Sequence, residues 1–450
     1  MKLWNIPMKL LLILFAFFLP LHALFVTILK CKLWANTDII RFWKEFIVIF
    51  LLFIWTYSIL KRYHFKIWKI FQGNYILWFS VAFIFSSLLY IFFPFFSVGI
   101  NNLLGFKYDV FFIFTLIAGF SLISIRNSID TILKSVFAST WLILIIFLPW
   151  YIFGDIALVS DFFGYSDKVS TYNANSCISF SQNVSWHHRF QASFGWPIRF
   201  SVFLIVFLFL YIWYILDTVK NHIYRSIFIS IPSLFVVTSV FFSYSKTSML
   251  GLMIWAFIFF YFLNKFIFKW KLTSKQKKVL KIVPILIAVS ATIIMFIKRG
   301  LFLHLWSLIN RFDNLALAVK KFLYNPIGSG VWTSGPATQI GPLETDVWWK
   351  SSINSIEVYK YLPENWYVQI LLEQSFLWLF FFLGLLIFIS IALYKIMQKT
   401  TTYFSIWLLT AFLSLCFMAN FTHAFEEAAT SYLLFLIIWA YIWKHYSLTK

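Results

Sequence analysis

Long apolar stretches recur along the whole chain and alternate with shorter polar connections. Each stretch is continuously apolar, whereas the strands of a membrane barrel alternate apolar and polar residues. A run of about 20 apolar residues is long enough for a helix to cross a bilayer. The pattern therefore predicts an all-α, polytopic membrane protein with about twelve spans.

The predicted spans form three groups along the sequence. The first group covers 9–29, 46–60, 75–93, 109–125 and 132–152; the second covers 197–216, 226–243, 247–263 and 282–297; the third covers 366–392, 403–422 and 428–443. The run at 9–29 is long for the apolar part of a signal peptide, so we predict a retained first span. Two large polar loops, 153–196 and 298–364, separate the groups, and residues 1–450 are predicted to form a single membrane domain.

Composition agrees with the pattern. With 62% hydrophobic and 12% charged residues and a mean hydropathy of +0.84, the chain is not an ordinary soluble domain. A net charge of +21 would suggest nucleic acid as the partner of a soluble protein. Here we expect the basic residues to lie in loops, where they fix orientation and meet anionic lipid, with no nucleic-acid partner.

The basic loops set the predicted orientation. The connection 264–281 contains seven lysines and no acid, which predicts a cytoplasmic loop. Counting spans from it places both termini in the cytoplasm and both large loops outside, together with the acidic turn at Glu426 and Glu427. Cys31 and Cys177 then face the same compartment. The loop 30–45 disagrees, because its basic residues would face out; these are Lys30, Lys32, Arg41 and Lys44.

The stretch 325–386 is where polar residues meet the lipid boundary. Before it, apolar residues at three- and four-residue steps from Leu301 to Val319 predict an amphipathic helix on the bilayer surface. The turn NPIGSG at 325–330 ends that helix. Arg299 and Arg311 are then predicted to lie near the membrane surface, where they meet either lipid phosphates or a substrate.

The span that begins at 366 has a polar start. Asn365 is a suitable N-cap, and Asn365, Gln369 and Glu373 form a polar stripe at four-residue spacing. A carboxylate such as Glu373 is costly inside a span unless it faces protein or water. Glu364 lies at the interface, where partial desolvation would raise its pKa toward that of a useful base. The alternative is a solvated loop acid near a helix N-terminus.

Cations are predicted on the same outer side. Arg189 and Arg199 flank a Gly-Trp-Pro turn before the sixth span, and Lys246 lies in a short turn between two apolar helices. Lys246 is either an anchor for its helix end or a ligand for an anion. The sequence has no P-loop, HExxH, GxSxG or DxD-type motif, so we predict neither a metal nor a cofactor.

In their order and sidedness these residues resemble the O-antigen polymerase/O-antigen ligase family of bacterial polysaccharide assembly. The resemblance covers roughly residues 190–390, and its segments are Ser245-Lys246, the NPIGSG turn, Glu364–Gln369 and, more weakly, Phe194–Pro197. Glu364 stands where ligases of the family usually have His, which favours a polymerase. Lys246 stands where Arg is more usual, and Ser375 stands where Gly is common.

The resemblance implies a glycosyltransferase of the bacterial inner membrane. It would transfer glycan from an undecaprenyl-diphosphate-linked oligosaccharide to the non-reducing end of another lipid-linked repeat unit, with a chain-length regulator protein left open as a partner. Lys246 and Glu364 would be catalytic; the substrate contacts would come from Arg189, Arg199, Arg299, Arg311, Asn365, Gln369 and Glu373. The alternatives are a ligase that transfers polymer to a lipid A core, or a flippase. A flippase should carry charges within many spans, and the predicted spans contain few.

Overall fold

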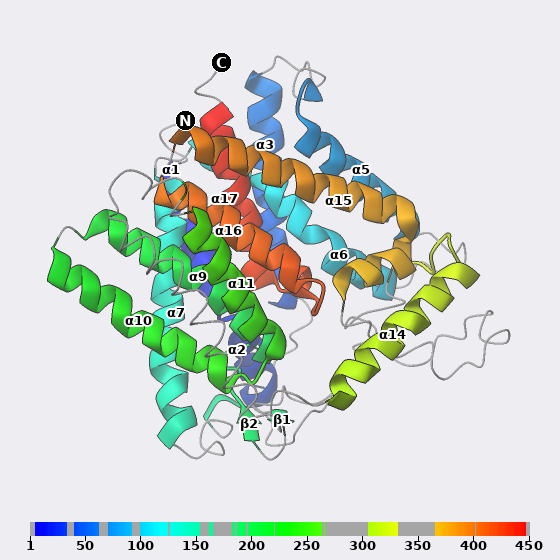
Figure 1. The fold of residues 1–450 in the computed structure, drawn as a ribbon. Helices are drawn as coiled ribbons and strands as arrows, with labels where there is room; N and C mark the ends of the chain where they lie inside the picture. Colours follow the sequence, from blue (N-terminus) through cyan, green and yellow to red (C-terminus); the bar gives the residue numbers. More distant parts are fainter. Residues whose placement is uncertain are drawn as a thin grey trace.

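The computed structural model describes residues 5–33, 40–62, 71–91, 100–124, 127–153, 162–164, 182–184, 187–194, 197–219, 221–262, 265, 305–331, 365–400 and 402–446. These residues are almost entirely helical, which confirms the predicted all-α class (Figure 1). The exception in this part of the chain is a short antiparallel hairpin of β1 (Gln182–Val184) and β2 (His187–Arg189). It lies within the predicted loop 153–196.

The helices follow the predicted spans with shifted ends. In the first half they are α1 (Asn5–Phe18), α2 (His22–Thr27), α3 (Trp43–Arg62), α5 (Tyr75–Ile91), α6 (Ile100–Ala118) and α7 (Ser128–Phe153). In the second half they are α9 (Pro197–Thr218), α10 (His222–Phe242), α11 (Lys246–Phe262), α14 (Leu305–Tyr324), α15 (Trp366–Thr400), α16 (Tyr403–Met418) and α17 (Ala428–Tyr446). The short elements that the site uses are η4 (Gly119–Ser124) and η9 (Ala424–Glu426).

Several helices have the length and composition of membrane spans. Among the described residues, 103–122, 128–153 and 366–400 are long and apolar enough to cross a membrane, and five further apolar helices are shorter. The count of about twelve spans stays a prediction. The span at 282–297, and the basic loop 264–281 apart from Lys265, lie outside the described residues.

The predicted first span at 9–29 is not a single straight helix in the structure. The helical pieces Pro7–Phe18 and His22–Lys32 are bent by 79° relative to each other. Pro20 lies between them, and proline removes a backbone donor and cannot continue the preceding helix. The Pro20 carbonyl accepts a hydrogen bond from the Ser193 hydroxyl at 3.1 Å, so part of the large loop packs against this bend.

α17 is the centre of the helical body. Its residues 429–442 are all buried, and it packs against α6 and η4 (Figure 1). A Cβ at Gly119 would lie 2.5 Å from the Leu436 carbonyl oxygen, so only glycine permits this close approach.

Candidate active site

The turn after α14 hydrogen-bonds to α15 at a break in that helix. Ser375 has φ 79° and ψ 172°, which are not helical values, so α15 consists of two helical pieces. The end of the front piece therefore has carbonyl groups without helical partners. The amides of Ser329 and Gly330 donate to the carbonyls of Leu372 and Glu373 at 2.9 and 2.8 Å. The NPIGSG turn and the polar start of α15 thus form one unit.

Glycine is required where the turn meets α15. Gly328 has φ +97°, and a Cβ there would lie 2.6 Å from the Glu373 carbonyl oxygen and 3.0 Å from the Ser375 amide nitrogen. The side chain of Asn325 holds the turn by donating to the Gly328 carbonyl at 3.0 Å. Both the backbone conformation and the close approach exclude a side chain at Gly328.

α14 is a helix that ends at Tyr324, as predicted. Its Ala318 is buried against Leu372 of the front piece of α15. Leu315 and Val319 are 44% and 50% exposed, and they lie four residues apart on the same side of α14. Such an exposed apolar row suits the predicted contact with a bilayer surface, which stays a prediction.

Asn365 caps α15, as predicted. Its Oδ1 accepts from the amides of Tyr367 at 3.0 Å and Val368 at 3.2 Å. With that oxygen engaged, the side chain has its amide group left for a ligand. Glu364, the predicted base and the residue bonded to Asn365, lies outside the described residues, as does Arg299. The side chain of Arg311 in α14 lies outside them too.

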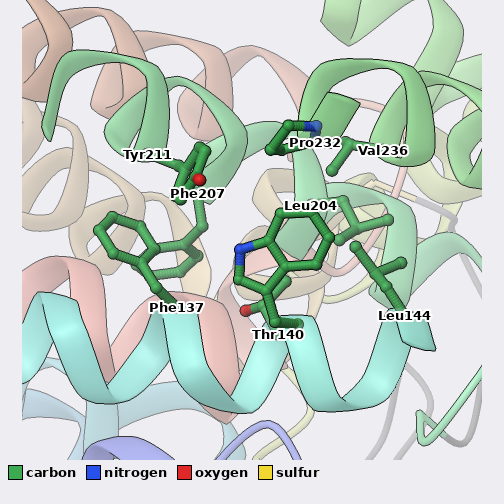
Figure 2. Close-up of a pocket in the computed structure, with 9 residues that line it drawn as sticks. Phe137, Thr140, Leu144, Leu204, Phe207, Tyr211, Pro232 and Val236 are labelled. Atoms are coloured by element: carbon green, nitrogen blue, oxygen red, sulfur yellow. The ribbon is translucent and has the colours of Figure 1, made fainter. Parts of the chain in front are cut away.

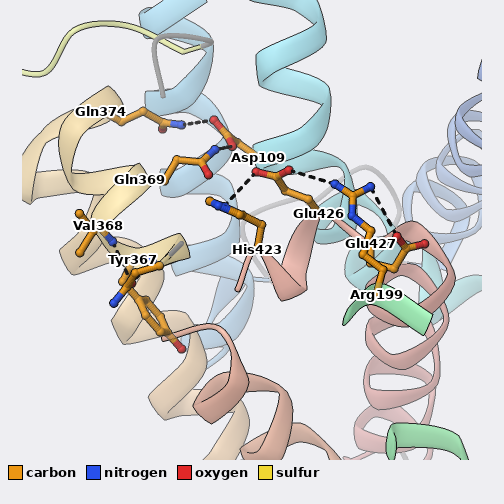
Figure 3. A network of polar contacts seen from close by, with 10 residues as sticks. Asp109, Arg199, Tyr367, Val368, Gln369, Gln374, His423, Glu426 and Glu427 are labelled. Carbon is orange, nitrogen blue, oxygen red and sulfur yellow. Dashed lines mark hydrogen bonds and ion pairs between the residues drawn. The ribbon is translucent and has the colours of Figure 1, made fainter. Parts of the chain in front are cut away.

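A buried carboxylate, Asp109 of α6, collects polar side chains from α15 (Figure 3). Gln369 Nε2 donates to Asp109 Oδ1 at 3.2 Å, and Gln374 Nε2 donates to Oδ2 at 3.0 Å. Glu373 is also buried and interacts with Asp109. The Ser87 hydroxyl donates to Gln374 Oε1 at 2.7 Å and so fixes the orientation of that amide. The predicted stripe of Gln369 and Glu373 therefore faces protein.

Arg199 lies between two acids of the turn before α17 (Figure 3). Its guanidinium is 3.6 Å from Glu427 and 4.0 Å from Glu426. Glu426 is also 3.7 Å from His423. The arginine predicted to bind substrate therefore pairs with the connection between α16 and α17.

The protonation of this turn follows from its burial. Desolvation raises the pKa of Glu426 to about 8, although Arg199 opposes the rise. Burial also raises the pKa of Glu427, and burial followed by repulsion from Arg199 lowers the pKa of His423 to about 3. At neutral pH His423 is therefore neutral and Glu426 is mostly protonated, so their contact is not an ion pair. Glu427 is the stronger partner of Arg199, because it is closer.

The other two described cations lie near the start of α11. Arg189 Nε donates to the Ser243 carbonyl at 2.8 Å, three residues before Lys246. In the first turn of α11 the Ser248 hydroxyl donates to Ser245 at 2.8 Å, and it also hydrogen-bonds Ser201 of α9. Because Ser201 is two residues after Arg199, the structure joins the segments of all three cations.

A second buried ionic cluster accounts for one of the four basic residues in the loop 30–45, which disagreed with the predicted orientation. Lys107 of α6 and Lys44 of α3 lie 3.0 and 3.4 Å from the same oxygen of Glu45, and Lys44 is also 2.9 Å from His22. Lys44 is therefore a buried structural residue and not a free loop charge. Cys31 is disulfide-bonded, which fits an oxidising compartment outside the cytoplasm.

Several of these residues are missed by sequence reasoning. The predicted span 109–125 places Asp109 at its edge, but α6 begins at Ile100 and holds both Lys107 and Asp109. The prediction of few charges within the spans therefore undercounts them. In the predicted outside turn Glu426 is buried and Glu427 is half-buried, so neither acid is fully solvated. In each case the sequence feature that could have identified these residues is an acidic residue directly beside an apolar run.

The cavity between α7, α9 and α10 is unsuited to chemistry (Figure 2). It has a volume of about 20 Å³, and Trp141, Tyr211 and Pro232 are among its lining residues. It is far too small for a sugar. Within the described residues no group of His, Cys, Asp and Glu could hold a metal ion.

No family model matches the sequence, and no curated protein matches it.

Proposed function

We propose that the protein is a polysaccharide polymerase of the bacterial inner membrane, acting on lipid-linked repeat units. One observation supports this most: segments far apart in sequence, which resemble the family motifs, are linked by contacts. Ser329 and Gly330 bond to α15, and Asn365 caps α15. The Trp366 amide of α15 bonds to the Ala419 carbonyl, in the connection whose Glu426 and Glu427 pair with Arg199. This gives a cation and the residue bonded to the candidate base a common framework.

The proposed reaction needs such a framework. The hydroxyl oxygen of the acceptor sugar attacks the anomeric carbon of the donor, and the bond from that carbon to the phosphate oxygen breaks. The electron pair leaves with undecaprenyl diphosphate, and Glu364 takes the hydroxyl proton. Lys246 stabilises the negative charge that grows on the diphosphate, assisted by an arginine such as Arg199.

We further propose about twelve spans, with the site outside and both termini in the cytoplasm. The disulfide at Cys31 and the burial of Lys44 support this orientation. The start of α1 and the end of α17 lie at the same end of the bundle in Figure 1, as an even number of spans requires.

The test compares alanine variants in a strain that depends on this protein for its surface polysaccharide. Glu364→Ala and Lys246→Ala should each abolish the long-chain ladder on a polysaccharide gel, while the protein is still found in the membrane. Lys134→Ala is the matched control, because Lys134 pairs with Asp130 on an exposed helix face. A ladder that survives both site changes would exclude these catalytic roles.

A flippase for lipid-linked oligosaccharide is the second candidate. It is favoured by the broken helix α15 and by the buried carboxyl groups of Asp109 and Glu373, which are features of transport sites. A flippase defect would leave the repeat unit on the cytoplasmic side, whereas a polymerase defect leaves single repeats at the surface. A ligase defect would instead give full-length polymer that stays on its lipid carrier.

A further inference from the structure

The front piece of α15 is positioned by contacts with neighbouring elements and not by continuity with the rest of the helix. The break at Ser375 separates residues 366–374 from the rest of α15. Its position is therefore set by neighbouring elements: the NPIGSG turn, α16 and α6. The Trp366 amide donates to the Ala419 carbonyl at 2.9 Å, and the Tyr367 hydroxyl donates to the Cys416 carbonyl at 2.7 Å.

Among these contacts, those of Asp109 fix the rotation of the front piece about its helix axis. Gln369 and Glu373 lie on one face of a helix, because they are four residues apart, whereas Gln374 is turned by about 100° from Glu373 and by about 140° from Gln369. Asp109 interacts with all three. A slip of the front piece by one residue would bring Ile370 to the position of Gln369 and remove these bonds, so the cluster permits one rotation.

Burying this cluster is costly, which indicates a role other than stability. Asp109 and Glu373 are each 1% exposed. Replacing a buried ionic group with apolar residues of similar size is often neutral or stabilising, whereas polar groups can specify a unique arrangement. The front piece also contacts the connection that holds the partners of Arg199, because the Trp366 amide bonds to Ala419 ahead of Glu426 and Glu427. The orientation of the front piece therefore bears on the connection that pairs with a cation.

We propose that Asp109 is a positioning residue, which orients the start of α15 so that the candidate base stands correctly against the cations. This rests on the proposed function. Asp109 itself touches no substrate, because it is enclosed by α6 and α15. It acts through Gln369, Glu373 and Gln374, and a misplacement of about 1 Å in such a framework can lower a rate about 100-fold.

Two substitutions of Asp109 distinguish a role in positioning through hydrogen bonds from a requirement for the charged carboxylate itself. Asp109→Leu removes every bond to α15. Asp109→Asn keeps an acceptor and adds a donor, and Gln369 can accommodate it by turning its amide. Thr115→Val is the matched control, because Thr115 is buried in the same helix and bonds only to the Phe112 carbonyl.

The experiment measures polymerisation and hydrogen exchange on the full-length protein, with rates expressed per folded molecule. D109L should lower kcat at least about 100-fold with little change in donor KM, while D109N and T115V stay within about tenfold of the wild type. Exchange of the amides in 366–374 should accelerate in D109L alone, and that of 376–400 should not change. Equal losses in D109N and D109L, or unchanged exchange in D109L, would overturn the proposal. If the wild type does not polymerise, the proposed function fails, and the exchange result still decides whether Asp109 positions α15.

Discussion

The contact between Gly328 and the break in α15 gives the most quantitative prediction. In a Gly328→Ala variant the new Cβ would lie 2.6 Å from the Glu373 carbonyl oxygen. Even the closest common carbon–oxygen contacts in proteins are about 3.3–3.6 Å. The turn must therefore move away by at least about 0.7 Å, which breaks the hydrogen bonds of Ser329 and Gly330 to α15.

The expected cost has two parts. An L residue at the φ of +97° costs about 1–2 kcal/mol. Each carbonyl left buried without a partner, at Leu372 and Glu373, costs about 1–3 kcal/mol. After partial relaxation we expect the free energy of unfolding to fall by about 3–5 kcal/mol.

A second glycine provides the control. Gly73 has φ +72°, and a Cβ added there would meet nothing within 4 Å, so Gly73→Ala should cost only the strain, about 1–2 kcal/mol. Both variants would be purified in detergent and unfolded by SDS titration with tryptophan fluorescence. Equal losses in the two variants would refute the close approach, and no loss in Gly328→Ala would show that the turn does not dock on α15.

Two further predictions concern single residues near this contact. Ser375→Gly should raise the free energy of unfolding by about 1 kcal/mol, because Ser375 has φ 79°. Ser390→Gly, at a regular position of the same helix, should lower the free energy of unfolding by about 1 kcal/mol. A loss of stability in both variants would contradict backbone strain at Ser375. Because burial raises the pKa of Glu426 to about 8, the folded state keeps a proton that the unfolded state releases above its ordinary value of 4.5. The free energy of unfolding should therefore fall as pH rises from 4.5 to about 8, and this fall should be shallower in Glu426→Gln, as measured by SDS titrations across that range. Parallel curves for the two proteins would exclude Glu426 as the titrating group.

The helices could be predicted from the sequence because apolar runs of span length have few other folds. The cap at Asn365 and the turn at 325–330 were also predictable, because each is determined by residues that are close together in the sequence. The break at Ser375 was not predicted, because serine has no preference for positive φ and the conformation depends on the docked turn.

The polar cluster could not be assembled from the sequence, because its members come from separate helices. Asp109 is 260 residues from Gln369 in sequence, and no local pattern connects them. Lys44 was counted as a loop charge, and its burial against Glu45 depends on how α3 packs with α6. Pairings of this kind follow from tertiary packing, which periodicity does not encode.

The most direct test of the polymerase function is a polysaccharide gel from a bacterial strain in which this gene is deleted. If the protein is a polymerase, the strain should display single capped repeat units at its surface, and the long-chain ladder should return when the gene is restored. An unchanged ladder in the deletion strain would contradict that function.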